Sequence, residues 1–294
     1  MHKRPSFKNF YVPLLFVALG INAKAQDTIP FTLGSDNRIY IKVRVNDSKP
    51  LDFIFDTGAS SMVVNTTQTD HKISLNFDSE VDNRGANGFT KQAVSSNNTL
   101  QIGKFIRKKE ELLGIAYPKE HYSFDGVVGY PFFKDYLIEI DYKLEHLIMH
   151  LNETTLSQRA TYESLPIDLK EDVPFIDMLI FKGEKAVVVP VMIDTGFNGE
   201  LIVYHKMIKK HGLANQFQQQ GTSASEGTDG SVIRSDRVFI PKATIGSIEF
   251  ADLPAYFNKT PSPTSFTAIL GGQILKEVHW VLDFKQRKAY FKVD

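Results

Sequence analysis

The sequence predicts a nearly all-β protein made of two copies of one domain. Aromatic residues favour sheet, since 22 Phe and 11 Tyr stand against a single Trp. Alternating apolar and charged residues at 38–45 indicate a half-buried strand. An ungapped internal repeat aligns GYPFFKDYLIEIDYKLEHLIMH (129–150) with GGQILKEVHWVLDFKQRKAYFK (271–292), at an offset of 271 − 129 = 142.

The repeat extends over most of the chain. Ile29–Leu33 resembles Leu165–Leu169, and Asp-Thr-Gly occurs at 56–58 and again at 194–196, an offset of 194 − 56 = 138. The copies therefore span about 29–150 and 165–294. Two copies form a duplicated domain, the covalent version of a symmetric dimer.

The local elements follow in chain order. Strands are expected at 38–45, 51–55 and 187–193, the last two being largely apolar runs that suit strands covered on both faces. A helix is expected at 204–211, and short helical turns are expected after Gly129 and after Gly271.

Residues 1–25 have the pattern of a secretory signal peptide. Basic residues precede an apolar stretch at 10–21, and Ala23-Lys24-Ala25 provides a small-x-small cleavage site. Twelve apolar residues are too few to span a bilayer comfortably. The expected mature chain begins near Gln26 and is exported, either to the periplasm or out of the cell, without stable membrane association. An uncleaved membrane anchor is the alternative.

The remaining chain divides into an N-terminal lobe at 26–151, a polar linker at 152–164 and a C-terminal lobe at 165–294. The formal net charge is zero, with 34 Lys and Arg against 34 Asp and Glu. No basic excess exists to neutralise phosphates, which argues against nucleic acid as a partner. The absence of Cys excludes disulfides, thiolate metal sites and a Cys nucleophile.

The motif that indicates chemistry is Asp-Thr-Gly, present once in each copy. Each Asp ends an apolar strand and is followed by turn residues, a setting that holds a carboxylate outside the core yet away from bulk water. Gly allows a tight turn and a free N–H that can face the carboxylate. Thr supplies a hydroxyl that can bond to the opposite loop. One such tripeptide is weak evidence, but two at the same place in two repeats are not.

These motifs resemble the aspartic proteases, both the two-lobed pepsin-like kind and the half-sized retroviral kind. In that superfamily each lobe contributes one Asp-Thr/Ser-Gly loop, and a hydrophobic-hydrophobic-Gly segment follows and packs beneath it. Val127-Val128-Gly129 and Ile269-Leu270-Gly271 match that segment in the two halves. The resemblance spans nearly the whole mature chain, and the lobe size looks more retroviral-like than pepsin-like.

The resemblance implies two retropepsin-like β-barrel lobes related by a pseudo-twofold axis, with the active site at their interface. It implies a monomeric endopeptidase that acts on a polypeptide substrate and needs no cofactor or metal. Asp56 and Asp194 would be catalytic, supported by the loop residues Thr57, Gly58, Thr195 and Gly196. Two carboxylates so close share one proton, and the pair activates a water that attacks the scissile carbonyl.

The position after each Asp-Thr-Gly departs from the pepsin-like pattern. Ala59 and Phe197 stand where those enzymes usually carry Ser or Thr. The dyad is therefore expected to be electrostatically asymmetric. Phe197 either narrows the cleft or packs beneath it, and the sequence leaves the two open.

Two Gly-rich turns are candidates for flaps over a bound peptide. Gly85, Gly88 and the adjoining Phe89 follow Asp56 by about 30 residues, and Gly227 and Gly230 follow Asp194 at a similar distance. Such turns suit the tips of β-hairpins that exclude water from a site. Ordinary surface hairpins are the alternative.

Other polar residues carry weaker signals. The eight His residues form no metal-binding spacing. Asp141 and Asp283 recur in both repeats but sit between two strands, which predicts turn-forming carboxylates. Ser60, Ser61 and Ser223 have no evident His and Asp partners, so a serine hydrolase has little support.

Two other functions remain open from the sequence. A protein of the same fold could bind peptides without cleaving them. Less favoured is a glycosidase that uses Asp56 and Asp194 as its carboxylate pair, whose two groups would lie about 5 Å apart or more.

Overall fold

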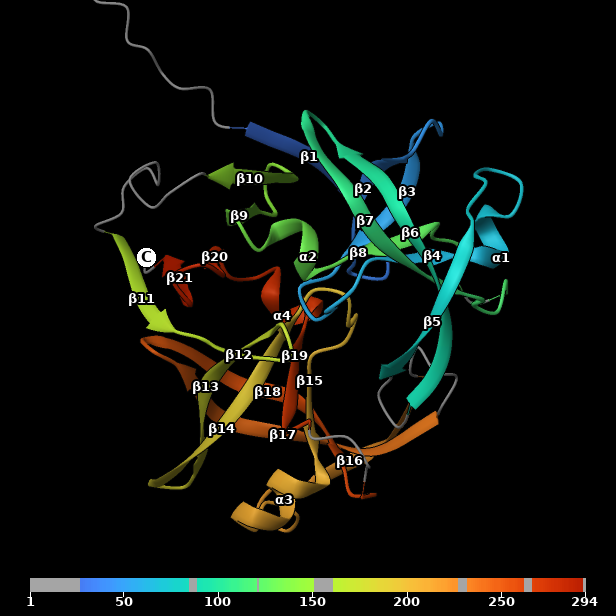
Figure 1. Ribbon diagram of the computed structural model, residues 1–294. Helices are drawn as coiled ribbons and strands as arrows, with labels where there is room; N and C mark the ends of the chain where they lie inside the picture. The colour runs from blue at the N-terminus through green and yellow to red at the C-terminus, as the bar shows by residue number, and fades with distance from the viewer. Residues whose placement is uncertain are drawn as a thin grey trace, which may run out of the picture.

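The structure is a computed structural model that describes residues 27–84, 89–120, 122–150, 161–226, 232–261 and 266–292. The regular structure of these residues is nearly all β, with only short helices between the strands, as the sequence predicts (Figure 1). The predicted signal peptide at 1–25 lies outside the described residues, as does most of the predicted linker. At the end of the range predicted to be linker, a strand begins at Tyr162.

The N-terminal half contains ten strands and two short helices among its described residues. In chain order they are β1 (Asp27–Leu33), β2 (Ile39–Val45), β3 (Leu51–Phe55), β4 (Val63–Asn65), α1 (Thr66–Thr69), β5 (Phe77–Arg84), β6 (Phe89–Ile102), β7 (Phe105–Ile115), β8 (Gly126–Val128), α2 (Tyr130–Phe133), β9 (Leu137–Asp141) and β10 (His146–His150).

The C-terminal half repeats this series, with the equivalent of β1 divided into two strands. Its described elements are β11 (Tyr162–Pro166), β12 (Asp168–Lys170), β13 (Val173–Lys182), β14 (Lys185–Asp194), β15 (Leu201–Tyr204), α3 (His205–His211), β16 (Gln219–Glu226), β17 (Val232–Ile245), β18 (Ile248–Asn258), β19 (Ala268–Gly271), α4 (Gly272–Leu275), β20 (Trp280–Asp283) and β21 (Lys288–Lys292).

The two halves have the same strand order. The first runs β2-β3-β8-β4-β7-β6-β5 and the second β13-β14-β19-β15-β18-β17-β16. Additional pairings β2–β6 and β13–β17 return each path of strands to its start and close a barrel. The same pairs are parallel in both halves, namely β3 with β8 and β14 with β19. The duplication read from the sequence is therefore a duplication of topology.

A six-stranded antiparallel sheet joins the two barrels, in the order β11-β21-β20-β9-β10-β1. Its central ladder pairs Trp280 with Ile140 and Leu282 with Ile138. Each residue of the first pair lies 142 positions from a residue of the second pair, which is the offset of the repeat. The two pairs are therefore equivalent, and the ladder is symmetric about its own centre. Figure 1 shows the N-terminal barrel at the upper right, the C-terminal barrel below and the joining strands at the left.

Burial follows from the strand pattern. In β2 the residues Ile39, Ile41, Val43 and Val45 point inward, and the intervening residues are more exposed. One apolar core runs through both halves and includes Phe53, Phe257 and the single Trp280. Smaller clusters flank it in each barrel, around Tyr117 in the first and around Ile202 in the second.

Candidate active site

Both Asp-Thr-Gly loops lie at the ends of central barrel strands. Asp56 follows the last residue of β3, and Asp194 is the last residue of β14. Each strand pairs in parallel with the strand that carries a hydrophobic-hydrophobic-Gly segment, β8 or β19. Pairing with β8 and with β19 therefore holds the strand that leads into each Asp-Thr-Gly loop.

The residue after each of those segments holds the loop by backbone hydrogen bonds. Tyr130 N–H donates to the Ala59 carbonyl at 2.9 Å, and Gly272 N–H donates to the Phe197 carbonyl at 2.7 Å. A side chain at Gly129 would lie 2.5 Å from the Ser61 carbonyl oxygen. The hydrophobic-hydrophobic-Gly segments therefore pack under the loops, and their glycines allow the close approach.

Thr57 and Thr195 join the two loops by reciprocal hydrogen bonds. Thr57 N–H donates to Thr195 Oγ1 at 3.1 Å, and Thr195 N–H donates to Thr57 Oγ1 at 3.2 Å. Each hydroxyl then donates to the opposite strand, Thr57 to the Ile193 carbonyl and Thr195 to the Phe55 carbonyl, both at 2.7 Å. Both threonines are buried at 1% exposure, so these bonds are shielded from water.

Each loop glycine packs against the carboxylate of the opposite loop. A side chain at Gly58 would lie 2.6 Å from Cγ of Asp194, and one at Gly196 would overlap the carboxylate of Asp56. These contacts bring Asp56 and Asp194 together at the junction of the two halves. They also explain why Gly follows Thr in both motifs.

The backbone around the two carboxylates donates hydrogen bonds to them. Gly58 N–H donates to Asp56 Oδ1 at 2.8 Å, whereas Asp194 Oδ1 accepts from both Gly196 and Phe197 N–H at 2.9 Å. Both aspartates keep partial exposure. The pair is therefore partly accessible and is held in place by backbone N–H donors.

Burial raises the pKa of both carboxyl groups, and that of Asp194 rises well above its usual range. The negative charge of Asp56 raises the pKa of Asp194 further. At Asp56, a hydrogen bond from the Asp194 side chain and the Gly58 N–H oppose the rise. Because each group shifts the pKa of the other, the two carboxyl groups titrate as a pair.

Arg38 makes the pair electrostatically asymmetric, and the sequence alone did not point to it. Its Nε–H donates to the Gly196 carbonyl at 2.7 Å, across the junction of the halves, and its Nη1 pairs with Asp36 at 2.9 Å. Burial raises the pKa of Asp56, and the charge of Arg38 opposes that rise. In the second repeat, the strand pairing makes Val173, the first residue of β13, the equivalent of Arg38, and Val173 carries no charge.

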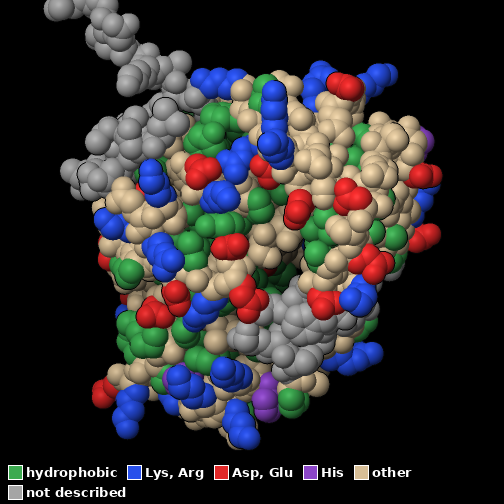
Figure 2. Space-filling model, in the orientation of Figure 1, with side chains coloured by type: hydrophobic (Ala, Val, Ile, Leu, Met, Phe, Trp, Pro, Cys, Tyr) green, Lys and Arg blue, Asp and Glu red, His purple; other side chains and the backbone are tan. Residues whose placement is uncertain are grey.

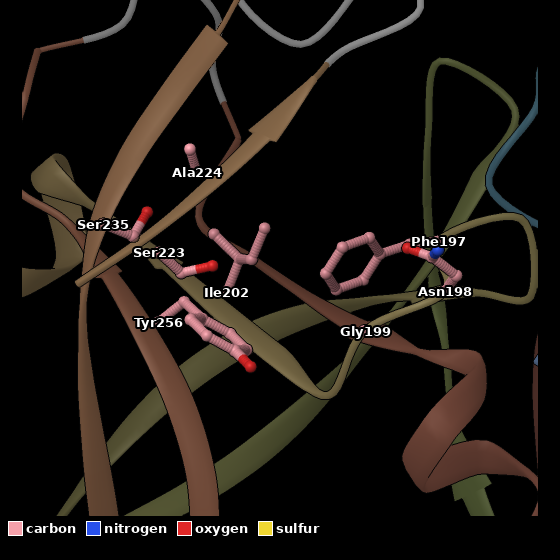
Figure 3. A pocket seen from close by; sticks show the side chains of 8 residues that line it. All are labelled: Phe197, Asn198, Gly199, Ile202, Ser223, Ala224, Ser235 and Tyr256. Carbon is pink, nitrogen blue, oxygen red and sulfur yellow. The ribbon is translucent and has the colours of Figure 1, made fainter. Parts of the chain in front are cut away.

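The structure settles how Phe197 lies. Its ring covers Gly199 and Gly271 of its own lobe, because side chains at these two positions would collide with it. It also lines a pocket of about 170 Å³ beside the second loop (Figure 3). Ala59 in the other half packs instead against an apolar cluster that contains the buried Tyr117. The two sides of the dyad differ in shape as well as in charge.

The predicted flap tips lie outside the described residues, namely Gly85, Gly88, Gly227 and Gly230. Phe89 is the first residue of β6, and its side chain also lies outside what the structure describes. The strands on either side are described and pair antiparallel, β5 with β6 and β16 with β17. The strands on either side of each predicted flap tip therefore pair as the arms of a hairpin, as expected. The role of the tips as flaps stays a prediction.

Asp141 and Asp283 form turns, as predicted. Asp141 Oδ1 accepts from Leu144 N–H at 2.9 Å, and Asp283 Oδ1 accepts from Gln286 N–H at 2.8 Å. These are equivalent bonds at the repeat offset of 142. Ser223, which found no catalytic partners in the sequence, lines the pocket beside Phe197.

Figure 2 shows Lys and Arg side chains interspersed with Asp and Glu over one face, with several basic residues near the lower end. Among the described residues, no group of three His, Asp or Glu is placed to hold a metal ion. No helix in the described part of the chain is long and apolar enough to cross a membrane.

Comparison with known families finds one match. Residues 41–132 match the family model described as aspartyl protease. The matched segment begins within β2 and ends within α2, so it contains Asp56-Thr57-Gly58 and Val127-Val128-Gly129 but none of the second repeat. No curated protein matches the chain. The family match supports a protease function for the half that holds Asp56.

Proposed function

We propose that this chain is an aspartic endopeptidase in which Asp56 and Asp194 together activate the attacking water. The observation that carries the proposal is the meeting of the two carboxylates, each against the glycine of the opposite loop. The aspartyl protease match over residues 41–132 supports it independently. One chain supplies both loops, so the proposed site needs no second copy of the chain to complete the pair of carboxylates.

The proposed reaction needs one ionised and one protonated carboxyl group. The ionised group takes a proton from water as its oxygen attacks the scissile carbonyl carbon, and the protonated group donates to the carbonyl oxygen. The tetrahedral intermediate then collapses, breaking the C–N bond while a proton passes to the leaving nitrogen. No covalent enzyme intermediate forms. The raised pKa of the pair suits this chemistry, because it keeps a shared proton in place.

The fixed donors around the pair account for its orientation. The N–H groups of Gly58, Gly196 and Phe197 hold the carboxylates, and the Thr57–Thr195 bonds hold the loops. Such preorganisation avoids rearrangement as charge develops in the transition state.

Direct contact between the carboxylates argues against the glycosidase alternative. A retaining glycosidase keeps its two carboxyl groups about 5 Å apart, and an inverting one keeps them further apart. Here the Asp56 and Asp194 side chains share a hydrogen bond. The alternative of a peptide-binding module without catalysis has the same geometry, and only an assay separates it from an enzyme.

The test is cleavage of casein and of a mixed peptide library by the purified chain, with and without pepstatin, from pH 3 to pH 8. Asp56→Asn and Asp194→Asn should each abolish cleavage, and the double variant should be no worse than either, since the pair acts as a unit. Asp141→Asn is the matched control, because Asn can accept the same turn hydrogen bond from Leu144. Cleavage that survives Asp56→Asn would refute the dyad. Binding of peptides without any cleavage would favour the binding module.

We also propose that the protein is exported after removal of residues 1–25. The basic start, the apolar stretch at 10–21 and Ala23-Lys24-Ala25 support this. N-terminal sequencing of the protein from expressing cells should give Gln26, whereas retention of Met1 in a membrane fraction would favour the anchor.

A further inference from the structure

We propose that the pocket beside Phe197 selects the substrate, accepting a medium-sized uncharged side chain that carries one hydrogen-bonding group, such as Gln or Asn. This inference rests on the proposed peptidase function and adds a substrate class to it. Eight residues line the pocket, and all are labelled in Figure 3: Phe197, Asn198, Gly199, Ile202, Ser223, Ala224, Ser235 and Tyr256.

The pocket adjoins the reacting groups. Phe197 forms one wall, and its own N–H donates to Asp194 Oδ1 at 2.9 Å. The opposite wall is the β16–β17 hairpin, where Ser223 and Ser235 face each other as a cross-strand pair. A side chain close to the scissile bond of a peptide lying over Asp194 would therefore enter this space.

The size of the pocket limits what it can hold. Its volume is about 170 Å³, and a cavity of about 150 Å³ holds a benzene molecule. A Gln, Asn or Met side chain fits that space, and an indole, which is larger than benzene, would fill it more tightly. The Phe197 ring sets this limit, because it extends from the catalytic loop over Gly199 and toward Ile202 (Figure 3).

The chemical character of the pocket walls decides which side chains of suitable size are favoured. The Phe197 and Tyr256 rings and Ile202 provide apolar contact for the stem of a side chain. None of the eight lining residues is charged, and the charged side chains next to them, Glu200 and Arg237, are already hydrogen-bonded to the Tyr256 hydroxyl. A carboxylate or an ammonium would therefore lose hydration on entering the pocket without gaining a charged lining residue as its partner. The pocket therefore disfavours Glu and Lys.

Ser235 adds the polar preference. The residue is 6% exposed, and among the described residues its Oγ is buried without any hydrogen-bond partner. Buried hydroxyl groups are normally paired, because an unpaired one loses the hydrogen bonds it made to water. A carboxamide on the substrate would supply the missing partner. Ser223 lies directly across from it and contributes a second hydroxyl to the same wall.

The other half of the molecule lacks this combination. Ile202 pairs with Tyr256 and with Ile269, and the equivalent ladder in the first half pairs Val63 with Leu113 and with Val127. Val63 and Leu113 belong to one buried apolar cluster with Tyr117, and Ala59 packs on that cluster. The cross-strand pair equivalent to Ser223 and Ser235 is Val81 and Gln92. Polar selectivity is thus a property of one side of the dyad.

The experiment measures kcat/KM for peptides that differ at one position near the cleaved bond. Each position on either side of the bond carries in turn Gln, Asn, Met, Glu, Ala or Trp. At one of these peptide positions, kcat/KM should be about three- to tenfold higher with Gln than with Met. This ratio corresponds to the effect of one net hydrogen bond. Glu and Trp should be the poorest at that position. Peptides cleaved with no preference there, or with Glu equal to Gln, would overturn the inference while the peptidase proposal stands.

Two variants locate the preference. Ser235→Ala should reduce the Gln-to-Met ratio to about one, and Phe197→Ala should raise cleavage of the Trp peptide relative to the Met peptide. Ratios measured on one preparation do not depend on how much of the variant has folded. Gln92→Ala, at the equivalent place in the first half, should leave both ratios unchanged. A ratio unaltered in Ser235→Ala would refute the role of that hydroxyl, and a lack of any Asp56-dependent cleavage would overturn the peptidase proposal and this inference with it.

Discussion

Glu139 and Val281 are equivalent residues of the two repeats, and they pair directly with each other in the β9–β20 ladder. They are separated by 281 − 139 = 142 residues, the offset of the repeat itself. A residue that pairs with its own equivalent lies on the symmetry axis, so the pseudo-twofold axis passes through this pair. The axis therefore carries a carboxylate on one side and an apolar side chain on the other.

Glu139 is surrounded by ring groups that stabilise its charge. Its two oxygens pair with His150 Nε2 and His279 Nε2, both at 2.8 Å, and Tyr162 donates to Oε1 at 3.1 Å. Burial alone would raise its pKa, but the hydrogen bonds from His150 and His279 outweigh burial and lower the pKa from 4.5 to about 2. These contacts join β9, β10, β11 and His279, the residue that precedes β20.

Glu139→Gln should therefore destabilise the joining sheet. A carboxyl group whose pKa is lowered in the folded state stabilises that state above its unfolded pKa, and this stability disappears as the pH falls through the window from 4.5 to about 2. The loss in the free energy of unfolding should be of the order of 3 kcal/mol at pH 7. Urea unfolding at pH 7 and at pH 2.5 measures it, and the difference from wild type should shrink at the lower pH. Glu277→Gln, on an exposed position, is the control.

The Thr57–Thr195 pair should couple the two lobes. Thr57→Val removes one hydroxyl and leaves the Ile193 carbonyl and the Thr195 N–H unpaired in a buried site. We expect a loss of about 1–3 kcal/mol in unfolding free energy, together with reduced kcat, because the loop is no longer held. Thr57→Ser keeps the hydroxyl and should retain most of both. A double-mutant cycle with Thr195→Val should show non-additive losses. Simple additivity would mean that the two threonines act separately.

Arg38 should set the acidic limb of the pH–rate profile. Burial raises the pKa of Asp56 and the Arg38 charge opposes that rise, so removing the charge should raise the pKa of the pair. In Arg38→Met, the fall in kcat/KM at low pH should move to higher pH by about half a unit to one unit. Arg38→Lys keeps the charge and should shift the limb less. Lys42→Met, which breaks an exposed ion pair with Asp52, should not shift it. A limb that stays in place in Arg38→Met would show that the field of Arg38 does not reach the dyad.

Asp194→Asn should be inactive yet more stable than wild type near neutral pH. The folded-state pKa of Asp194 is raised above 3.8, so the folded protein binds more protons than the unfolded chain above that pH. Wild-type stability therefore falls as the pH rises through this window, and Asn removes the effect. Each unit of raised pKa corresponds to about 1.4 kcal/mol.

Urea unfolding at pH 3 and pH 7.5 tests this prediction. The gain should appear at pH 7.5 and vanish at pH 3. Asp36→Asn provides a control of opposite sign, because hydrogen bonds from Tyr40 and Arg38 outweigh burial and lower the pKa of Asp36. Its replacement should reduce stability at pH 7.5. Equal effects of the two substitutions would contradict the opposite pKa shifts.

Local pattern in the sequence was enough for the strands and for the duplication. The strand predicted at 51–55 is β3 (Leu51–Phe55), and the helix predicted at 204–211 is α3 (His205–His211). Periodicity reports which face of an element is buried, and an ungapped repeat reports two copies of one topology. The placement of each Asp at a strand end followed from the same local signals.

Only the tertiary structure decided what lies around the two aspartates. The Arg38 bond to the Gly196 carbonyl joins residues 158 positions apart, and the Thr57–Thr195 bonds join residues 138 positions apart. The unpaired Ser235 hydroxyl and the way the Phe197 ring lies depend on side chains from several strands. Such contacts arise from strand register and packing between the repeats, which no local pattern records. The sequence by itself thus determined two equivalent halves with one Asp-Thr-Gly each, and packing between those halves made the two sides of the site unequal.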